Sequence, residues 1–315
     1  MTRNPSAPGS EVFSALDPAA RTLIAGDLRA VFLPGRGMLG ASLRHRGQEL
    51  LGRVEDLEGS IRTGTTCGIP ILHPWANRLD GLRYAAAGRS VELDAASPLL
   101  RFDRNGLPSH GVSWTELPWE VSEARPDTLT AWLDWRRDGL LAIFPFPHRL
   151  ELTATIRPAN LTIATTLIAD GDSRVPVSFG FHPYFRIPDL PRAEWRVEMP
   201  AMRRLVLDAR NIPTGQEEPF AALDARLGEL EFDDGFVVFE GQPSFALSGG
   251  SRRITVEFLE GYPCAQVYAP RGKDFIAFEP MTAPTNALVA GHGLRLIEPG
   301  GALRATFRIG VEARS

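Results

Sequence analysis

Hydrophobic and polar residues alternate along much of the chain. Between residues 149 and 157 the even-numbered positions are apolar and the odd-numbered positions are polar or charged. A Pro-Ala-Asn turn follows at residues 158–160, and a second alternating run begins at Leu161. Successive side chains of a β-strand point to opposite faces, so these two runs predict an antiparallel hairpin with one buried face.

The same alternation recurs at residues 129–135, 254–258 and 303–309, and 30 glycines and 26 prolines punctuate the chain with turns. Many short strands separated by turns predict an all-β fold, a large antiparallel β-sandwich with few short helices. Apolar residues at helical spacing predict one helix at residues 220–230. Without a linker or an internal repeat, residues 1–315 are interpreted as one domain, whose first ten residues are expected to be frayed.

Composition narrows the possible functions. Hydrophobic residues make up 43% of the chain and charged residues 23%, as in an ordinary globular protein. A net charge of −4 provides no electrostatic signature for nucleic acid or for an anionic membrane. No apolar run has the length of a membrane span or a signal peptide, so a cytoplasmic location is expected. Cys67 and Cys264 are expected to be buried thiols in a reducing compartment, because two distant cysteines form no disulfide framework.

Two segments combine polar side chains with an apolar or glycine-rich approach. Asn77 and Arg78 follow an apolar, aromatic stretch. The guanidinium group is a planar fork of donors suited to hydroxyl or carboxylate oxygens, although an arginine in a surface turn would look the same. His110 stands beside Gly111, where the backbone allows another group to approach closely. A single histidine is more often structural than catalytic, so this segment indicates a functional site only together with the other candidate segments.

Two further segments contain groups that can transfer protons. His182 lies among aromatic residues, where partial desolvation makes its proton affinity depend on its neighbours. Glu279 ends an apolar run, and a glutamate is almost never buried without a partner. It is either a member of a structural ion pair or a general base in a pocket, and the pattern favours the base. The remaining histidines are interpreted as structural or exposed: His45, His73, His148 and His292.

Taken together and in this order, these segments resemble the aldose 1-epimerase (galactose mutarotase) family. The resemblance runs from about residue 68 to the C-terminus and rests on A-N-R-L-D-G at residues 76–81, the His-Gly pair at 110, H-x-Y-F at 182 and E-P-x-x-x-P-x-N at 279. F-D-D-G-F at residues 232–236 and A-Q-V-Y-A-P at 265–270 are weaker matches. The resemblance implies an antiparallel sandwich with the sugar in a cleft across one sheet and no cofactor or metal. The His-Gly pair runs directly into Val112 without the longer insertion of galactose-specific members, so the sugar stays unassigned.

The resemblance also implies roles. His182 would be the general acid and Glu279 the general base that open and reclose the sugar ring, interconverting the α and β anomers of a free hexose or related aldose. A carboxylate beside a histidine is expected to raise the histidine pKa and to stay ionised itself. The sugar hydroxyls would be held by Arg78, Asn77, His110, Asp233 and Gln266, with Asp234 as the alternative to Asp233. Candidates for an aromatic platform under the sugar are Trp75, Trp114, Tyr184 and Phe185.

Two other functions stay open. A hexose-6-phosphate 1-epimerase would use the same acid and base together with basic residues that converge on a phosphate, for which Arg83, Arg101, Arg104 and Arg186 are candidates. A non-catalytic sugar-binding module would suit the sandwich but has no need for an acid and a base. In each case the expected partner is a small-molecule sugar, with neither nucleic acid nor membrane, in a monomer or a homodimer joined at sheet edges.

Overall fold

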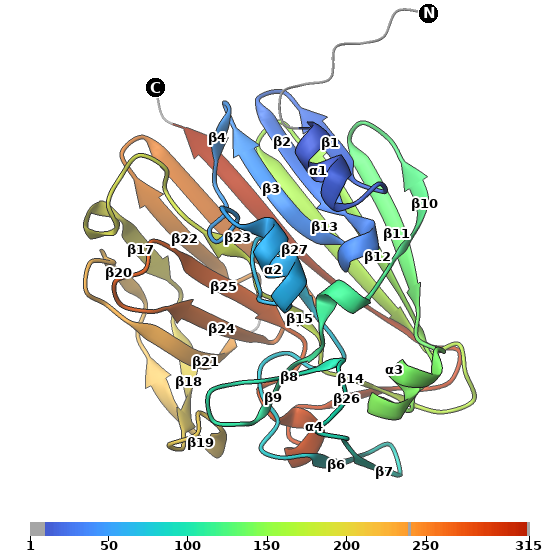
Figure 1. Cartoon of the computed structure of the whole chain (residues 1–315). Helices are drawn as coiled ribbons and strands as arrows, with labels where there is room; N and C mark the ends of the chain where they lie inside the picture. The colour runs from blue at the N-terminus through green and yellow to red at the C-terminus, as the bar shows by residue number, and fades with distance from the viewer. Residues whose placement is uncertain (1–9, 239–240, 314–315) are drawn as a thin grey trace, which may run out of the picture.

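The computed structural model describes residues 10–238 and 241–313, which form two large antiparallel sheets with smaller sheets and short helices around them (Figure 1). The larger sheet contains, in spatial order, β10 (Glu120–Ala124), β11 (Thr128–Asp134), β12 (Arg149–Arg157), β13 (Asn160–Ile168), β27 (Ala302–Ala313), β23 (Arg252–Glu260), β22 (Ser244–Gly249), β17 (Arg196–Met199) and β20 (Leu223–Arg226). The second contains β19 (Pro213–Phe220), β18 (Met202–Leu207), β21 (Phe232–Val238), β24 (Cys264–Ala269), β25 (Ile276–Met281), β15 (Gly180–Phe181) and β5 (Ile71–Leu72), with β16 (Tyr184–Phe185) also paired to β25.

Smaller elements surround the two sheets. A four-stranded sheet is formed by β1 (Arg21–Ala25), β2 (Leu28–Leu33), β3 (Leu39–His45) and β4 (Gln48–Glu49). Three strand pairs are β6 (Arg83–Ala86) with β7 (Arg89–Glu92), β8 (Leu100–Phe102) with β9 (Pro108–Val112), and β14 (Val175–Val177) with β26 (Arg295–Ile297). The helices are α1 (Ser10–Leu16), α2 (Leu57–Thr63), α3 (Asp138–Ile143) and α4 (Ala287–Ala290), with 3-10 turns η1 (Pro34–Arg36), η2 (Trp114–Glu116) and η3 (Arg192–Glu194).

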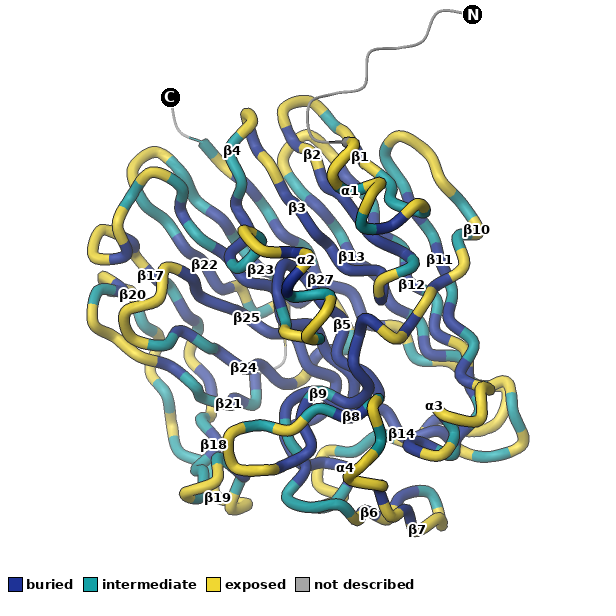
Figure 2. The backbone as a smooth tube through the Cα atoms, viewed as in Figure 1, coloured by how far each residue is buried: buried dark blue, intermediate teal, exposed yellow. Residues whose placement is uncertain are grey.

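The core lies between the two large sheets. Phe181 of the smaller sheet contacts Phe307 of the larger one at a ring-centroid distance of 5.0 Å, and Phe278 contacts Phe245 at 5.5 Å. Figure 2 shows the buried backbone concentrated in the middle of both sheets. Because side chains alternate along a strand, the neighbour of each core residue on the smaller sheet points to its opposite face. Glu279, next to Phe278, is such a neighbour.

The predicted sandwich and the hairpin are confirmed. β12 and β13 pair antiparallel from Arg149 with Ile168 to Arg157 with Asn160, and the apolar residues of β12 are fully buried. The alternating runs at 254–258 and 303–309 fall in β23 and β27, and the run at 129–135 falls in β11 except for its last residue, Trp135. Cys67 and Cys264 are buried and unpaired, as expected.

The predicted helix at residues 220–230 is wrong. β19 ends at Phe220 and β20 begins at Leu223, so the segment is extended and pairs with β17. Phe220 packs on Phe236 at a centroid distance of 5.0 Å, and the Leu227 amide donates to the Trp195 carbonyl. Pairing with neighbouring strands outweighs the local helical spacing.

Two other expectations concern the chain ends and the membrane. The fraying predicted for residues 1–10 falls almost entirely on residues 1–9, which lie outside the described residues; α1 begins at Ser10. Within the described residues, no helix has both the length and the apolar character needed to cross a membrane.

Candidate active site

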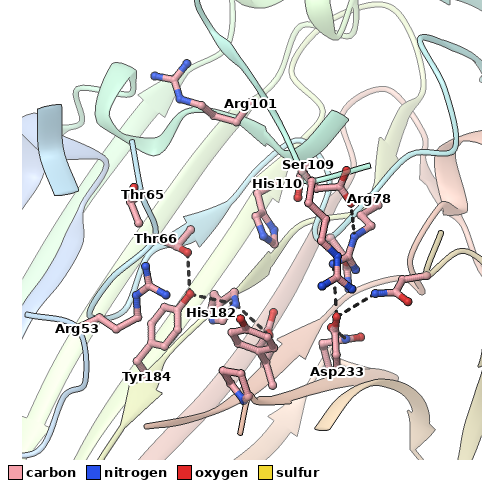
Figure 3. Close-up of a pocket in the computed structure, with 18 of the residues that line it drawn as sticks. Arg53, Thr65, Thr66, Arg78, Arg101, Ser109, His110, His182, Tyr184 and Asp233 are labelled. Atoms are coloured by element: carbon pink, nitrogen blue, oxygen red, sulfur yellow. Dashed lines mark hydrogen bonds and ion pairs between the residues drawn. The ribbon is translucent and has the colours of Figure 1, made fainter. Parts of the chain in front are cut away.

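A cavity of about 690 Å³ lies over the face of the smaller sheet that points away from the core. Its walls come from the outward-facing side chains of β21, β24 and β25, from segments around residues 63–66 and 77–78, and from the β8–β9 hairpin at residues 101–110 (Figure 3). All seven site residues predicted from the sequence line it: Asn77, Arg78, His110, His182, Asp233, Gln266 and Glu279. The fold thus brings together segments that are far apart along the chain.

Strand pairing places His182 beside Glu279. β15 and β16 both pair with β25, through Gly180 with Met281 and Tyr184 with Ala277, and His182 lies between them. Position 180 must be glycine, since a Cβ there would lie 2.7 Å from the Pro280 carbonyl oxygen. The result is a 3.2 Å contact between His182 Nε2 and Glu279 Oε1, with both residues buried.

Burial sets the protonation of this pair. Desolvation lowers the pKa of His182 well below its usual value. Electrostatic interactions with His110, Arg53 and Arg78 lower it further. Desolvation likewise raises the pKa of Glu279 well above its usual value, with the Asp233 carboxylate adding to the effect. The expectation that the carboxylate would raise the histidine pKa is therefore wrong, because both groups are too deeply buried for their mutual attraction to prevail. Both shifts favour the neutral forms, an imidazole at His182 and a carboxylic acid at Glu279.

Tyr184 extends the pair. Its hydroxyl lies 3.2 Å from His182 Nε2 and 2.7 Å from Thr66 Oγ1. Its ring stacks on the imidazole at a centroid distance of 4.2 Å and an interplanar angle of 16°. The Arg53 guanidinium lies over the tyrosine ring, 5.2 Å from its centre. These contacts hold the imidazole plane in one orientation.

A polar cluster lies on the other side of the pair. Gln266 is the register partner of Glu279 on the adjacent strand, and its Nε2 donates to Asp233 Oδ1 over 2.9 Å. Arg78 Nη2 lies 3.5 Å from Asp233 Oδ2, and Arg78 Nε donates to Asp103 over 2.8 Å. Asp234 lies 3.7 Å from Arg204 and does not line the cavity. Of the two adjacent acids, Asp233 therefore faces the site.

Two residues with left-handed backbone conformations, Asn77 in a loop and His110 in β9, line the cavity opposite the sheet. Asn77 has φ 59° and His110 has φ 62°, and the His110 amide donates to the Asn77 carbonyl over 2.7 Å. Such conformations are uncommon for non-glycine residues and concentrate at functional sites. A Cβ at Gly111 would lie 2.2 Å from the His73 carbonyl oxygen, so the His-Gly pair requires the glycine. Burial lowers the pKa of His110 to about 4, and its Nδ1 has no partner within the described residues.

Some predicted supporting residues lie elsewhere. Of the platform candidates only Tyr184 lines the cavity. The predictions for Trp75, Trp114 and Phe185 are wrong, because these side chains are buried in hydrophobic clusters and do not line the cavity. Of the phosphate candidates, Arg101 and Arg104 line the cavity. The other two do not: Arg83 pairs with Glu92 and Arg186 with Glu55.

The remaining histidines lie outside the cavity. His73 and His148 form a buried pair with their Nε2 atoms 2.9 Å apart, His45 is buried near Arg252, and His292 is exposed. The interpretation of these four as structural or exposed agrees with these positions.

Several lining residues were missed in the sequence. Tyr268 lies two positions after Gln266 on β24, so the two-residue period of a strand could have indicated that both face the cavity. Asn211 donates to Asp233 from a turn, and Arg53 comes from an irregular segment. No local pattern distinguishes these two residues.

Comparison with known proteins agrees with this geometry. The family model for aldose 1-epimerase matches residues 38–310. The chain belongs to the aldose 1-epimerase family. The match covers the residues of all the strands that carry the cavity.

Individual relatives are distant. The Escherichia coli (strain K12) protein YihR is 23% identical over 250 residues, covering 76% of this chain and 77% of that protein. The Slr1438 protein from Synechocystis sp. PCC 6803 is 25% identical with a TM-score of 0.77, covering 100% of this chain and 99% of that chain. A galactose mutarotase-like protein from Clostridium acetobutylicum has a TM-score of 0.78 at 18% identity, covering 94% of this chain and 95% of that chain. These likenesses show the galactose mutarotase-like fold.

Proposed function

We propose that this aldose epimerase family member is an aldose 1-epimerase, which interconverts the α and β anomers of an aldose by acid and base catalysis. The observation that carries the proposal is the 3.2 Å contact between His182 Nε2 and Glu279 Oε1 inside the cavity. A cyclic hemiacetal has its ring oxygen and its anomeric hydroxyl on one carbon. Two proton-transfer groups this close can therefore each contact one of those oxygens.

The proposed reaction begins with the single proton of the pair. Transfer of this proton from Glu279 to His182 Nε2 produces a carboxylate and an imidazolium. Glu279 then removes the proton of the anomeric hydroxyl while His182 protonates the ring oxygen, and the bond between C1 and the ring oxygen breaks. The aldehyde rotates about the C1–C2 bond, and reclosure returns both protons by the reverse steps.

The cluster of Asp233, Gln266 and Arg78 suits the hydroxyls of the sugar ring, because it offers both acceptors and donors from rigid strands and a buttressed loop. Tyr184 and Tyr268 supply aromatic surface for the apolar face of the sugar. Asn77 and His110 add polar groups from above. Fixing the ring while C1 reacts supplies the orientation that the reaction needs.

The test is the rate of mutarotation of freshly dissolved α-D-glucose and other α-aldoses, followed by polarimetry. His182→Ala and Glu279→Gln are each expected to lower kcat by about 10²- to 10⁴-fold, the contribution of one positioned acid or base. The matched controls are His292→Ala and Glu257→Gln, at positions outside the cavity, and both should retain full activity. Full activity in either site variant would disprove the mechanism. Sugar binding without any acceleration over buffer would instead support a binding module.

A further inference from the structure

The two halves of the cavity differ in charge compensation. On the side of Asp233, each acidic group is partnered: Asp233 and Asp103 contact Arg78, and Glu231 lies 4.0 Å from Arg271. On the side of Tyr184, Arg53 lines the cavity and makes neither a hydrogen bond nor an ion pair with any described residue. Figure 3 shows the Arg53 guanidinium and the Arg78–Asp233 cluster on opposite sides of His182.

Arg53 is held in place although it lacks a counter-ion. Its guanidinium lies 5.2 Å from the centre of the Tyr184 ring and 5.5 Å from that of Phe275. These cation–π contacts use the charge of the guanidinium and occupy none of its N–H groups with a hydrogen-bond acceptor. An arginine with five unused donors on a cavity wall is suited to the oxygens of an anion.

Neighbouring groups add to this positive half. Arg101 directs Nη1 at two backbone carbonyls, but its Nε is buried without a hydrogen-bond partner. The Arg101 side chain lies against Gly64. Gly64, Thr65 and Thr66 are consecutive and all three line the cavity (Figure 3).

The proposed reaction places the sugar relative to this half. If His182 serves the ring oxygen, then C5, bonded to that oxygen, lies on the His182 side of the ring. The exocyclic carbon of an aldohexose is attached to C5. Tyr184 stacks on His182 and Arg53 stacks on Tyr184, so the exocyclic group points toward Arg53.

We infer that the substrate is an aldose that carries an anionic group on its exocyclic carbon, bound by Arg53 with Arg101 at the rim. This inference rests on the proposed function, because the ring orientation follows from the proposed acid. The shared chemistry is an oxyanion, which a phosphate or a carboxylate could supply. A neutral hydroxyl would leave the positive half without compensation.

The experiment compares glucose, glucose 6-phosphate and glucuronate with the full chain, using NMR exchange between anomers after subtraction of the buffer rate. We expect kcat/KM for at least one anionic sugar to exceed that for glucose by about tenfold or more, as expected for a charge-assisted hydrogen bond. Arg53→Gln should remove this advantage, so that the ratio of kcat/KM for the anionic sugar to kcat/KM for glucose falls to about one. Arg53→Lys keeps the charge and should retain most of the advantage, which separates charge from packing on Tyr184. Arg62→Gln, an exposed arginine outside the cavity, is the matched control and should behave as the unsubstituted protein.

The outcomes separate the two proposals. Equal losses on glucose and on both anionic sugars in Arg53→Gln, or no preference for either anion, would overturn the anion site and leave the epimerase proposal standing. If no sugar is turned over, calorimetric titration with glucose 6-phosphate, glucuronate and glucose still decides the anion site. Tighter binding of an anionic sugar that Arg53→Gln abolishes would support it, and equal binding of all three would refute it. The preferred anion identifies phosphate or carboxylate as the group.

Discussion

The buried pair His73 and His148 is expected to make the fold sensitive to acid. His148 Nδ1 lies 2.6 Å from the Phe146 carbonyl oxygen and therefore donates to it, so His148 Nε2 accepts from His73 Nε2 over 2.9 Å. A proton added to His148 would go to Nε2 and leave this N–H group facing the N–H group of His73 in an aromatic environment. Burial lowers the pKa of His148 from 6.5 to about 4, despite the opposing effects of the hydrogen bond to Phe146 and of Asp170 and Asp134.

The difference in the His148 pKa between the folded and the unfolded chain makes the free energy of unfolding depend on pH. Because the pKa is lower in the folded chain, the unfolded chain binds the extra proton first, so stability is complete above pH 6.5 and is lost as pH falls toward 4. This one group should remove about 2 kcal/mol of unfolding free energy by pH 5 and about 3 kcal/mol by pH 4. Urea unfolding at a series of pH values measures the loss.

The discriminating variant is His148→Asn, whose amide can still donate to the Phe146 carbonyl. It should be less stable at pH 7.5, because His73 loses its acceptor, but its stability should fall less steeply between pH 7.5 and pH 5. His292→Asn, at an exposed position, should keep the slope of the unsubstituted protein. Parallel curves for the unsubstituted protein and His148→Asn would refute the assignment.

Two further predictions concern residues that the site requires. Glu279→Gln should lower kcat by about 10²- to 10⁴-fold. It should nevertheless raise the free energy of unfolding at pH 8.5 by about 1–3 kcal/mol, because burial disfavours ionisation of this carboxyl in the folded chain, whereas in the unfolded chain it ionises freely; equal or lower stability in thermal unfolding would contradict this. Gly111→Ala should destabilise by several times more than Gly106→Ala and also lower mutarotation, since both glycines have positive φ but only at Gly111 would a Cβ strike backbone. Equal losses in urea unfolding would show that the contact with His73 is unimportant.

The sequence predicts the hairpin well and the helix at 220–230 poorly for related physical reasons. β12 and β13 are neighbours along the chain, so their alternation and their turn contain nearly all the information that sets their pairing. Residues 220–230 pair with β17 and β18 and pack on Phe236, and these contacts are not encoded in the local spacing. A local pattern therefore predicts the pairing of strands that are neighbours along the chain. It fails where contacts with strands that are distant in the sequence determine the secondary structure.

The candidate site is likewise predicted in part by local sequence and in part determined by the pairing of distant strands. His182 and Glu279 stand out as residue types in unusual apolar surroundings, but their contact depends on β15 and β16 both pairing with β25. The protonation of the pair depends on how deeply that pairing buries it, which is why the expected pKa directions were wrong. Arg53 has no local signal, because its importance lies in having no counter-ion in three dimensions.

The placement of the groups also bears on how one site could serve two anomers. The α and β hydroxyls leave C1 in different directions, so a rigid sugar could not present both to one carboxylate. Under the proposed reaction the ring is held by Asp233, Gln266 and Arg78 while the open aldehyde turns about C1–C2. Glu279 and Gln266 come from adjacent, register-paired strands, so the base and the group that holds the ring keep a constant separation during this turn. Under the proposed reaction only the open sugar moves, while the sheet keeps Glu279 and the residues that hold the ring in place. Ring opening and ring closure can therefore use the same acid and the same base.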